Sequence, residues 1–217
     1  PNTTWVARKE LVDSGVLDNL SNLKGMKIAF SPVSSAEYAL DTLLNDSGLS
    51  SADVQILDIP VPARLEGLGT GAVDIAAMSE PWATRAINAG SSVIWQPWEG
   101  YMPNFELSII MYGPNLLEKN PDVGKRFMTA YLNALKQYAE GKTERNVEIV
   151  VKFTELTPEE VRQSCWIAVN PQGTINIPQI LEFQEWAIHK GYLVDRVTPE
   201  QFYDSSFIEQ AFELISK

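Results

Sequence analysis

The residues best suited to chemistry begin with three serines that follow an apolar run. The stretch 31–41 reads SPVSSAEYALD, and the apolar residues 26–30 precede it. Exposed N–H groups at a helix start, flanked by hydroxyl groups, can hold an anionic or polar ligand. The structural alternative is a helix cap, because a serine and a glutamate three residues apart have the spacing of a capping box. The candidates in this stretch are Ser31, Ser34, Ser35 and Tyr38, and Glu37 would complete the box with Ser34.

A second polar stretch, Ser79-Glu80-Pro81-Trp82, follows the apolar run VDIAAM in the same way. Glu80 is suited to accept a hydrogen bond from a ligand amine or hydroxyl group, or, alternatively, to place a negative charge at a helix N-terminus. Trp82 either stacks on the ligand or packs beneath the domain. We predict that Ser79, Glu80 and Trp82 bind the ligand together with the serines of the first stretch.

Aromatic residues crowd the region just beyond these two stretches: Trp95, Trp98, Tyr101 and Phe105. Aromatic faces suit a flat heterocycle or a quaternary ammonium group. Ordinary core packing is the alternative, and it is favoured for Trp95 because this residue lies inside a predicted strand. We include Tyr101 among the predicted ligand-binding residues.

The chain has one cysteine, Cys165, and one histidine, His189. An intrachain disulfide, a Cys/His zinc site and a multi-histidine metal site are therefore excluded. Neither residue has the companion that a Cys–His nucleophile needs, and no carboxylate pair is singled out by its spacing for acid–base catalysis. We predict no metal, no cofactor and no enzymatic activity.

The composition indicates a folded, acidic protein. The chain has 217 residues, of which 45% are hydrophobic, enough for one large domain or two small lobes. Its net charge of −11 disfavours nucleic acid and anionic membrane surfaces as partners, although local N–H dipoles can still hold a small anion. No apolar run approaches the ~20 residues that span a bilayer.

Strands and short helices alternate over residues 24–98. Apolar runs predict strands at 27–31, 54–59, 73–78 and 92–96, and a helix with the 3.6-residue period follows the first of them. This alternation predicts right-handed βαβ units and a mostly parallel sheet. The class is therefore α/β.

Beyond residue 98 the pattern becomes mostly helical. One more strand is predicted at FELSIIMY (105–112), and a β-like run ending at Lys9 predicts a strand before the alternating region. We divide the chain into 1–23, a lobe-one strand and hinge crossing; 24–98, lobe two; and 99–217, a second crossing, a return to lobe one and a helical C-terminal tail. Two crossings of this kind indicate a two-strand hinge with a ligand cleft between lobes.

Several phrases, taken in order, resemble a known family. LKGMKIAFSPVSSAEYALDTLL, VPARLEGLGTGAVDIAAMSEPWATRAINAG and NPDVGKRFMTAYLNAL are similar to solute-binding proteins of ABC importers of the nitrate, sulfonate, taurine and thiamine-precursor type. The ending, in which Phe202-Tyr203-Asp204 precedes Phe207, resembles this group as well. The resemblance implies a type 2 periplasmic-binding fold, removal of a signal peptide, and a periplasmic or extracellular, membrane-anchored location.

Family members carry a further segment before the position of Trp5, so lobe one is expected to be incomplete here. A truncated or clipped chain is the favoured explanation, and a bare strand edge predicts self-association of such a chain.

The resemblance implies a receptor that captures a small sulfonate, nitrate-like anion or heterocycle in the interlobe cleft and delivers it to an ABC permease. The aromatic content favours an organic ligand over nitrate. Two alternatives stay open: an enzyme of thiamine-pyrimidine synthesis on the same fold, and the effector-sensing domain of a transcription regulator.

Overall fold

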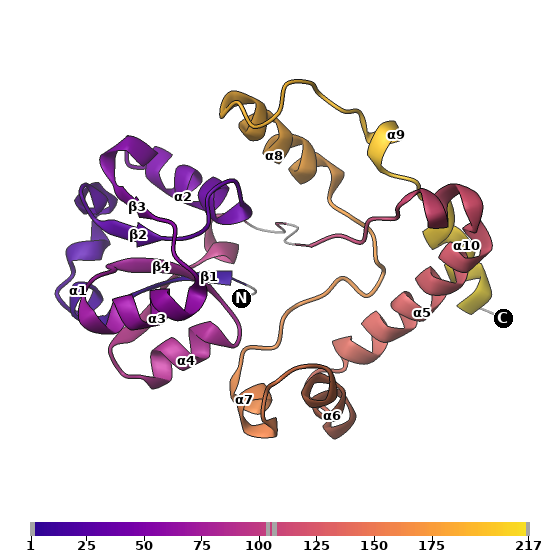
Figure 1. Ribbon diagram of the computed structural model, residues 1–217, viewed down its shortest axis with the longest axis horizontal. Helices are drawn as coiled ribbons and strands as arrows, with labels where there is room; N and C mark the ends of the chain where they lie inside the picture. Colours follow the sequence, from indigo (N-terminus) through magenta and orange to yellow (C-terminus); the bar gives the residue numbers. More distant parts are fainter. Residues whose placement is uncertain (1–2, 103–104, 106–107, 216–217) are drawn as a thin grey trace. The chain divides into compact units, whose positions relative to one another are not determined.

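The computed structural model of this chain describes residues 3–102, 105 and 108–215, and it combines one β-sheet with many helices (Figure 1). The chain divides into two compact units. Unit 1 comprises Pro1–Phe105 and Leu156–Ile167, and unit 2 comprises Glu106–Glu155 and Ala168–Lys217. The predicted α/β class is confirmed. The predicted lobe boundaries after residues 23 and 98 stay a prediction.

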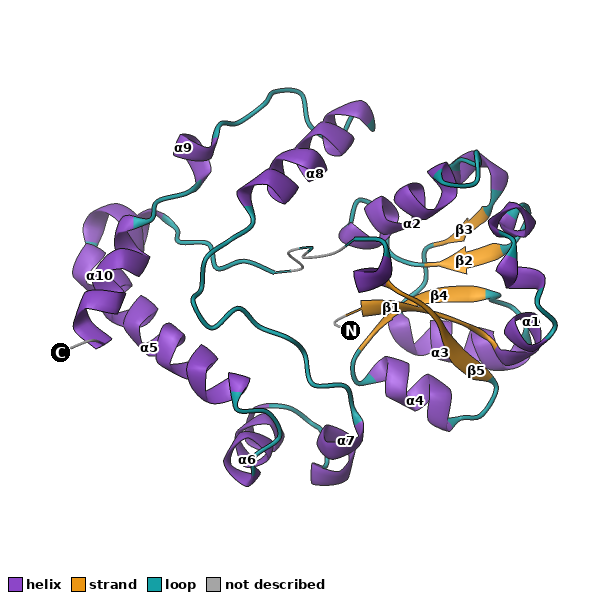
Figure 2. Ribbon diagram, turned by 180° about the vertical axis from the view of Figure 1, so that it is seen from behind, coloured by secondary structure: helices purple, strands orange, loops and turns teal. Residues whose placement is uncertain are grey.

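Unit 1 is built around a five-stranded sheet (Figure 2). The strands are β1 (Thr3–Arg8), β2 (Lys27–Ala29), β3 (Gln55–Leu57), β4 (Ile75–Ser79) and β5 (Ser92–Pro97), in the order β3-β2-β4-β1-β5. Strand β2 is parallel to β3 and β4, whereas β1 is antiparallel to β4 and β5. Strands β2 to β5 therefore share one direction, as the alternating pattern predicted, and β1 runs against them.

Two of the predicted strands differ from the structure. The N-terminal strand belongs to the same sheet as the strands of residues 24–98, because β1 pairs with β4 and β5. Residues 4–7 are all buried, which fits the place of β1 between two other strands. The strand predicted at 105–112 is absent from its described part, since residues 108–112 have no strand pairing. Residues 106 and 107 lie outside the described part of the chain.

The helices of unit 1 lie against the sheet and beside it. They are α1 (Lys9–Asp13), α2 (Ser35–Asn45), α3 (Val61–Thr70), α4 (Trp82–Asn88) and α7 (Pro158–Gln163). A buried cluster on one sheet face joins Val6, Ala29 and Ala76 to Leu68 of α3 and Ala83 of α4. Strand residues that alternate with these point to the other face, where the rings of Trp5 and Phe30 meet edge to face with centroids 6.3 Å apart. Both faces of the sheet are thus buried.

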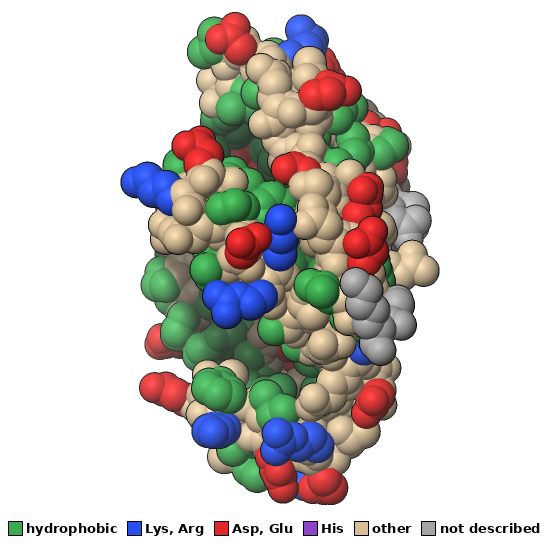
Figure 3. Space-filling view, turned by 90° about the vertical axis from the view of Figure 1, so that its right-hand side faces the viewer, with side chains coloured by type: hydrophobic (Ala, Val, Ile, Leu, Met, Phe, Trp, Pro, Cys, Tyr) green, Lys and Arg blue, Asp and Glu red, His purple; other side chains and the backbone are tan. Residues whose placement is uncertain are grey.

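Unit 2 is helical in its described residues. Its helices are α5 (Pro121–Ala139), α6 (Glu144–Phe153), α8 (Ile177–His189), α9 (Pro199–Phe202) and α10 (Ser206–Ile215). Leu132 of α5 and Ala211 of α10 are fully buried in the cluster that joins these two helices. Tyr112 fastens the segment before α5, because its hydroxyl donates to the carbonyl oxygen of Gly124 at 2.6 Å. On the face over α5 and α10, acidic and basic side chains are interspersed with apolar ones (Figure 3).

Candidate ligand-binding site

The carboxyl ends of β2, β3 and β4 meet at one edge of the sheet because these strands are parallel. From β2 the chain passes through α2 to β3 on one side, and then through α3 to β4 on the other side of β2. The order of strands therefore reverses between β2 and β4, and such a switch point is the usual ligand site of open α/β sheets. Both predicted stretches, 31–35 and 79–82, follow the two strands that flank it.

The β2–α2 loop, residues Phe30–Ser34, ends in a helix cap. The Ser34 hydroxyl accepts a hydrogen bond from the N–H of Ala36 at 3.2 Å, and it donates to the carbonyl oxygen of Ser31 at 2.5 Å. Its hydrogen and one lone pair are thus both engaged within the loop. The cap that the sequence allowed at Ser34 is therefore present.

The capping box expected between Ser34 and Glu37 takes a different form. The Glu37 carboxylate is almost fully buried and accepts from the N–H of Val33 at 2.7 Å, one residue before the usual partner. Val33 has a φ of 55°, a left-handed conformation that is rare for a β-branched residue, and its side chain is 65% exposed. Glu37 thus holds the loop in an unusual backbone shape, and such shapes are concentrated at binding sites.

Ser31 is held by a residue that the sequence reasoning missed. Arg64 of α3 is 6% exposed, and its Nη2 donates to the Ser31 hydroxyl at 2.8 Å. Its Nε donates to the carbonyl oxygen of Ile59 at 2.8 Å, and its Nη1 to that of Ala77 at 3.0 Å. One guanidinium group therefore connects the three segments at the carboxyl ends of β2, β3 and β4. Sequence spacing alone carries no signal for this role, since Arg64 stands in a short helix of ordinary composition.

Ser35 and Tyr38, the other two candidates of this stretch, lie in the first turn of α2. Both are half-buried. The ring of Tyr38 stacks on that of Phe105 with centroids 5.5 Å apart, which gives it a packing role. The Ser35 side chain has no hydrogen-bond partner among the described residues, so its hydroxyl is available to a ligand.

The second predicted stretch forms the β4–α4 loop, residues Ser79–Pro81, and leads into Trp82. The Ser79 side chain is exposed at the end of β4. Glu80 accepts from two backbone N–H groups, that of Thr84 through Oε2 at 3.2 Å and that of Cys165 through Oε1 at 2.9 Å. Its carboxylate thus serves both as the negative group at the start of α4 and as an attachment for a segment 85 residues away.

Trp82 packs against the buried cluster of the sheet, and the Arg85 guanidinium lies over its ring, 4.9 Å from the centroid. The packing that the sequence allowed for Trp82 is therefore present, and a contact of Trp82 with a ligand stays a prediction. Tyr101 has a similar place. Its hydroxyl accepts from Nε1 of the buried Trp5 at 2.6 Å, and burial raises the pKa of the Tyr101 phenol.

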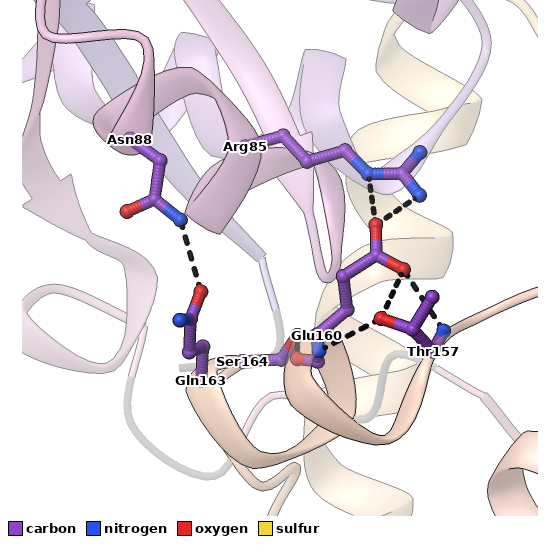
Figure 4. Close-up of polar contacts among 6 residues, drawn as sticks. All are labelled: Arg85, Asn88, Thr157, Glu160, Gln163 and Ser164. Atoms are coloured by element: carbon purple, nitrogen blue, oxygen red, sulfur yellow. Dashed lines mark hydrogen bonds and ion pairs between the residues drawn. The ribbon is translucent and has the colours of Figure 1, made fainter.

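A cluster of polar contacts attaches α7 to α4 (Figure 4). The Arg85 guanidinium donates to Glu160 Oε1 from Nε at 3.0 Å and from Nη2 at 2.6 Å, and Asn88 donates to Gln163 at 3.2 Å. Glu160 also completes a capping box with Thr157, accepting from its N–H at 2.9 Å. Hydrogen bonding from Thr157 and then from Arg85 lowers the pKa of Glu160 to about 2. Together with Glu80, these residues fix Leu156–Ile167 on unit 1.

A cavity of about 430 Å³ lies at the opposite edge of the sheet. Arg8, at the end of the antiparallel strand β1, and Gly71 and Ser91, which precede β4 and β5, contribute to its lining. It is therefore separate from the predicted site. Among the described residues, no group of three or more His, Cys, Asp and Glu side chains is placed to hold a metal ion. In the same part of the chain, no helix has both the length and the apolar character needed to cross a membrane.

Known folds resemble this one over nearly its whole length. A ligand-binding component of an ABC-type import system from Staphylococcus aureus, with zinc bound, has a TM-score of 0.74 at 12% identity, covering 97% of this chain and 70% of that one. The periplasmic nitrate-binding protein NrtA from Synechocystis PCC 6803 has 0.70 at 12% identity, covering 99% and 65%. The periplasmic aliphatic sulphonate binding protein SsuA from Escherichia coli has 0.68 at 16% identity, covering 96% and 72%. The expected periplasmic-binding-protein fold is thus confirmed.

A protein named as the desulfurization enzyme DSZB shares the fold too, with a TM-score of 0.58 at 13% identity, covering 99% of this chain and 76% of that one. A search of curated proteins found no match. The family model described as NMT1/THI5 like matches residues 1–144, about two thirds of the sequence. The chain therefore belongs to the NMT1/THI5-like family.

Proposed function

We propose that this chain is a ligand-binding receptor of an ABC importer, acting outside the cytoplasm and passing a small organic or anionic solute to a permease. The observation that carries the proposal is the placement of the two predicted stretches on either side of the switch point between β2 and β4. Fold neighbours named as binding proteins for nitrate and sulphonate support it at the level of the fold.

The predicted residues fall into two groups, those that contact the ligand and those that support them. We propose that Ser31, Ser35 and Ser79 contact the ligand, because the side chains of Ser31 and Ser79 are exposed and the Ser35 hydroxyl has no partner among the described residues. We assign a supporting role to Ser34, Glu80, Trp82 and Tyr101, whose polar groups or rings are engaged within unit 1. Tyr38 would border the site through its ring.

A binding role is favoured over catalysis by the residues themselves. The sequence has one cysteine and one histidine, and neither Cys165 nor His189 lies in the β2–α2 or β4–α4 loop. The neighbour named as an enzyme shares only the fold with this chain, and a shared fold does not carry a shared reaction.

The experiment is a thermal-unfolding screen of the purified chain against methanesulfonate, taurine, nitrate and an aminopyrimidine. A ligand at 100 times its Kd stabilises the folded state by about 2.7 kcal/mol, which raises Tm by several degrees. We expect at least one of these solutes to do so without being consumed. An unchanged Tm with all four would refute the receptor proposal, and turnover of a bound solute would favour the enzyme alternative.

A further inference from the structure

We propose that the ligand carries a negative charge and that Ser31 binds its charged group, with Arg64 as the positioning residue that turns the Ser31 hydroxyl hydrogen toward it. This inference rests on the proposed function and specifies its ligand class. It depends on the direction of the hydrogen bond between Arg64 and Ser31, on the burial of Arg64, and on the position of these two residues at the carboxyl ends of the strands.

The hydrogen bond between Arg64 and Ser31 has only one possible direction. A guanidinium group is a donor and never an acceptor, so the Ser31 oxygen must accept from Nη2. The hydroxyl hydrogen of Ser31 is therefore left to donate elsewhere. The Ser31 side chain is exposed, and its hydroxyl donates to no acceptor among the described residues. A hydroxyl group fixed as a donor favours an anionic or strongly accepting ligand atom.

The charge of Arg64 favours an anion over a neutral acceptor. Arg64 is 6% exposed, and its guanidinium group forms no salt bridge with a described residue. Its three hydrogen-bond acceptors, two carbonyl oxygens and the Ser31 hydroxyl, are all uncharged. Burial lowers the pKa of Arg64, and the exposed Asp58 carboxylate offsets this only in part. A buried positive charge without an ion pair attracts an anion strongly, because little water screens it.

The position of Ser31 connects this charge to the switch point. Ser31 follows β2, Ile59 follows β3 and Ala77 lies in β4, so Arg64 holds all three parts of the sheet edge in a fixed relation. Its rigid, planar fork is suited to this task, and a lysine could make only part of these contacts. The Arg64 side chain thus sets both the preference for an anionic ligand and the geometry of the loop.

The test compares two small probes of similar shape, methanesulfonate, which is an anion, and dimethyl sulfone, which is neutral. Affinities are measured by NMR titration or calorimetry on the full chain. Wild-type protein should bind methanesulfonate at least tenfold more tightly than dimethyl sulfone. Ser31→Ala should weaken methanesulfonate binding about tenfold, the worth of one charge-assisted hydrogen bond, and change sulfone binding little.

Arg64→Met should abolish the preference for the anion, and Arg64→Lys should restore part of it because the charge returns. Ser21→Ala, an exposed serine in a short turn before β2, is the matched control and should change neither affinity. If Arg64→Met does not fold, Ser31→Ala decides alone.

The outcomes separate the two proposals. Methanesulfonate binding that is unaffected by Ser31→Ala, or equal affinity of the wild-type protein for both probes, overturns this inference and leaves the receptor function standing. Failure of the wild-type protein to bind any solute of the wider screen overturns the receptor function and this inference with it.

Discussion

The β2–α2 and β4–α4 loops occupy equivalent places in unit 1 but engage their polar groups differently. In the first loop, Arg64 holds Ser31 by its oxygen, and the hydroxyl hydrogen remains available at the surface. In the second loop, both oxygens of Glu80 accept backbone N–H groups, one from α4 and one from Cys165. We infer that the first loop serves the ligand and that the second serves to attach Leu156–Ile167.

A polar residue after a strand therefore does not by itself mark a ligand contact. Glu80 looks like a ligand acceptor in the sequence because its second partner lies far along the chain. The role of Ser31 is equally hidden in the sequence, because its partner Arg64 is remote as well. The partners that decide the role are brought together only by the order of the strands.

The largest effect on stability is expected for Arg64→Met. This change removes the Arg64 donor from the part-buried carbonyl oxygen of Ile59 and from the buried one of Ala77, and each unsatisfied buried group costs about 1–3 kcal/mol. We expect the free energy of unfolding to fall by about 3 kcal/mol or more in urea denaturation. A loss below about 1 kcal/mol would mean that Arg64 does not hold the three strand ends together.

A smaller loss is expected for Glu80→Gln. A glutamine side chain keeps one acceptor oxygen, so one of the two backbone N–H bonds is lost, at a cost of about 1–2 kcal/mol. Amide hydrogen exchange at Cys165 should become faster, whereas exchange in α2 should not change. If ligand affinity falls more than stability does, Glu80 is a ligand contact after all and the contrast between the loops is wrong.

Ser34→Ala should cost about 1 kcal/mol, the usual worth of an N-cap. The loss should be seen in the unfolding midpoint and in faster exchange at Ala36, whose N–H bonds to the Ser34 hydroxyl. Ser34→Asp keeps a good capping residue and should recover most of the stability. Full stability of Ser34→Ala would show that the cap contributes nothing.

The smallest effect is the pH dependence of the α7 attachment. Because the pKa of Glu160 is lowered from its usual 4.5 to about 2, its contribution to stability is complete above about pH 4.5 and is lost as the pH falls toward 2. The pair with Arg85 is partly exposed, so salt should weaken it. Amide exchange in α7 should rise over this pH range in wild-type protein, and Glu160→Gln should remove that dependence. The same profile in both proteins would exclude Glu160 as its source.

Features that depend on near neighbours in the sequence were predictable. The capping box of Thr157 and Glu160 and the helix that opens at Pro121 follow from local spacing and from proline at the first turn. The Ser34–Glu37 spacing predicts the cap at Ser34 correctly, but the capping box that it also predicts is absent. The left-handed φ of Val33 lets Glu37 accept from the N–H of Val33 instead.

Features that depend on the order and direction of strands were not predictable. The sequence of β1 predicts a strand but not its direction, and only its pairing with β4 and β5 shows that it is antiparallel and lies inside the sheet. An apolar run at 108–112 has the composition of a strand, yet composition does not provide a neighbouring strand to pair with. Arg64 was missed for the same reason, since its three acceptors lie 5, 13 and 33 residues away.

The most direct test of the contrast between the loops is an NMR titration of isotope-labelled protein with methanesulfonate. We expect the largest amide shifts in the stretch Ser31–Ala36 and in the guanidinium signal of Arg64, with little change at Thr84 and Cys165. Shifts that are largest at Glu80–Thr84 and Cys165, with none in Ser31–Ala36, would contradict the assignment of the ligand to the β2–α2 loop.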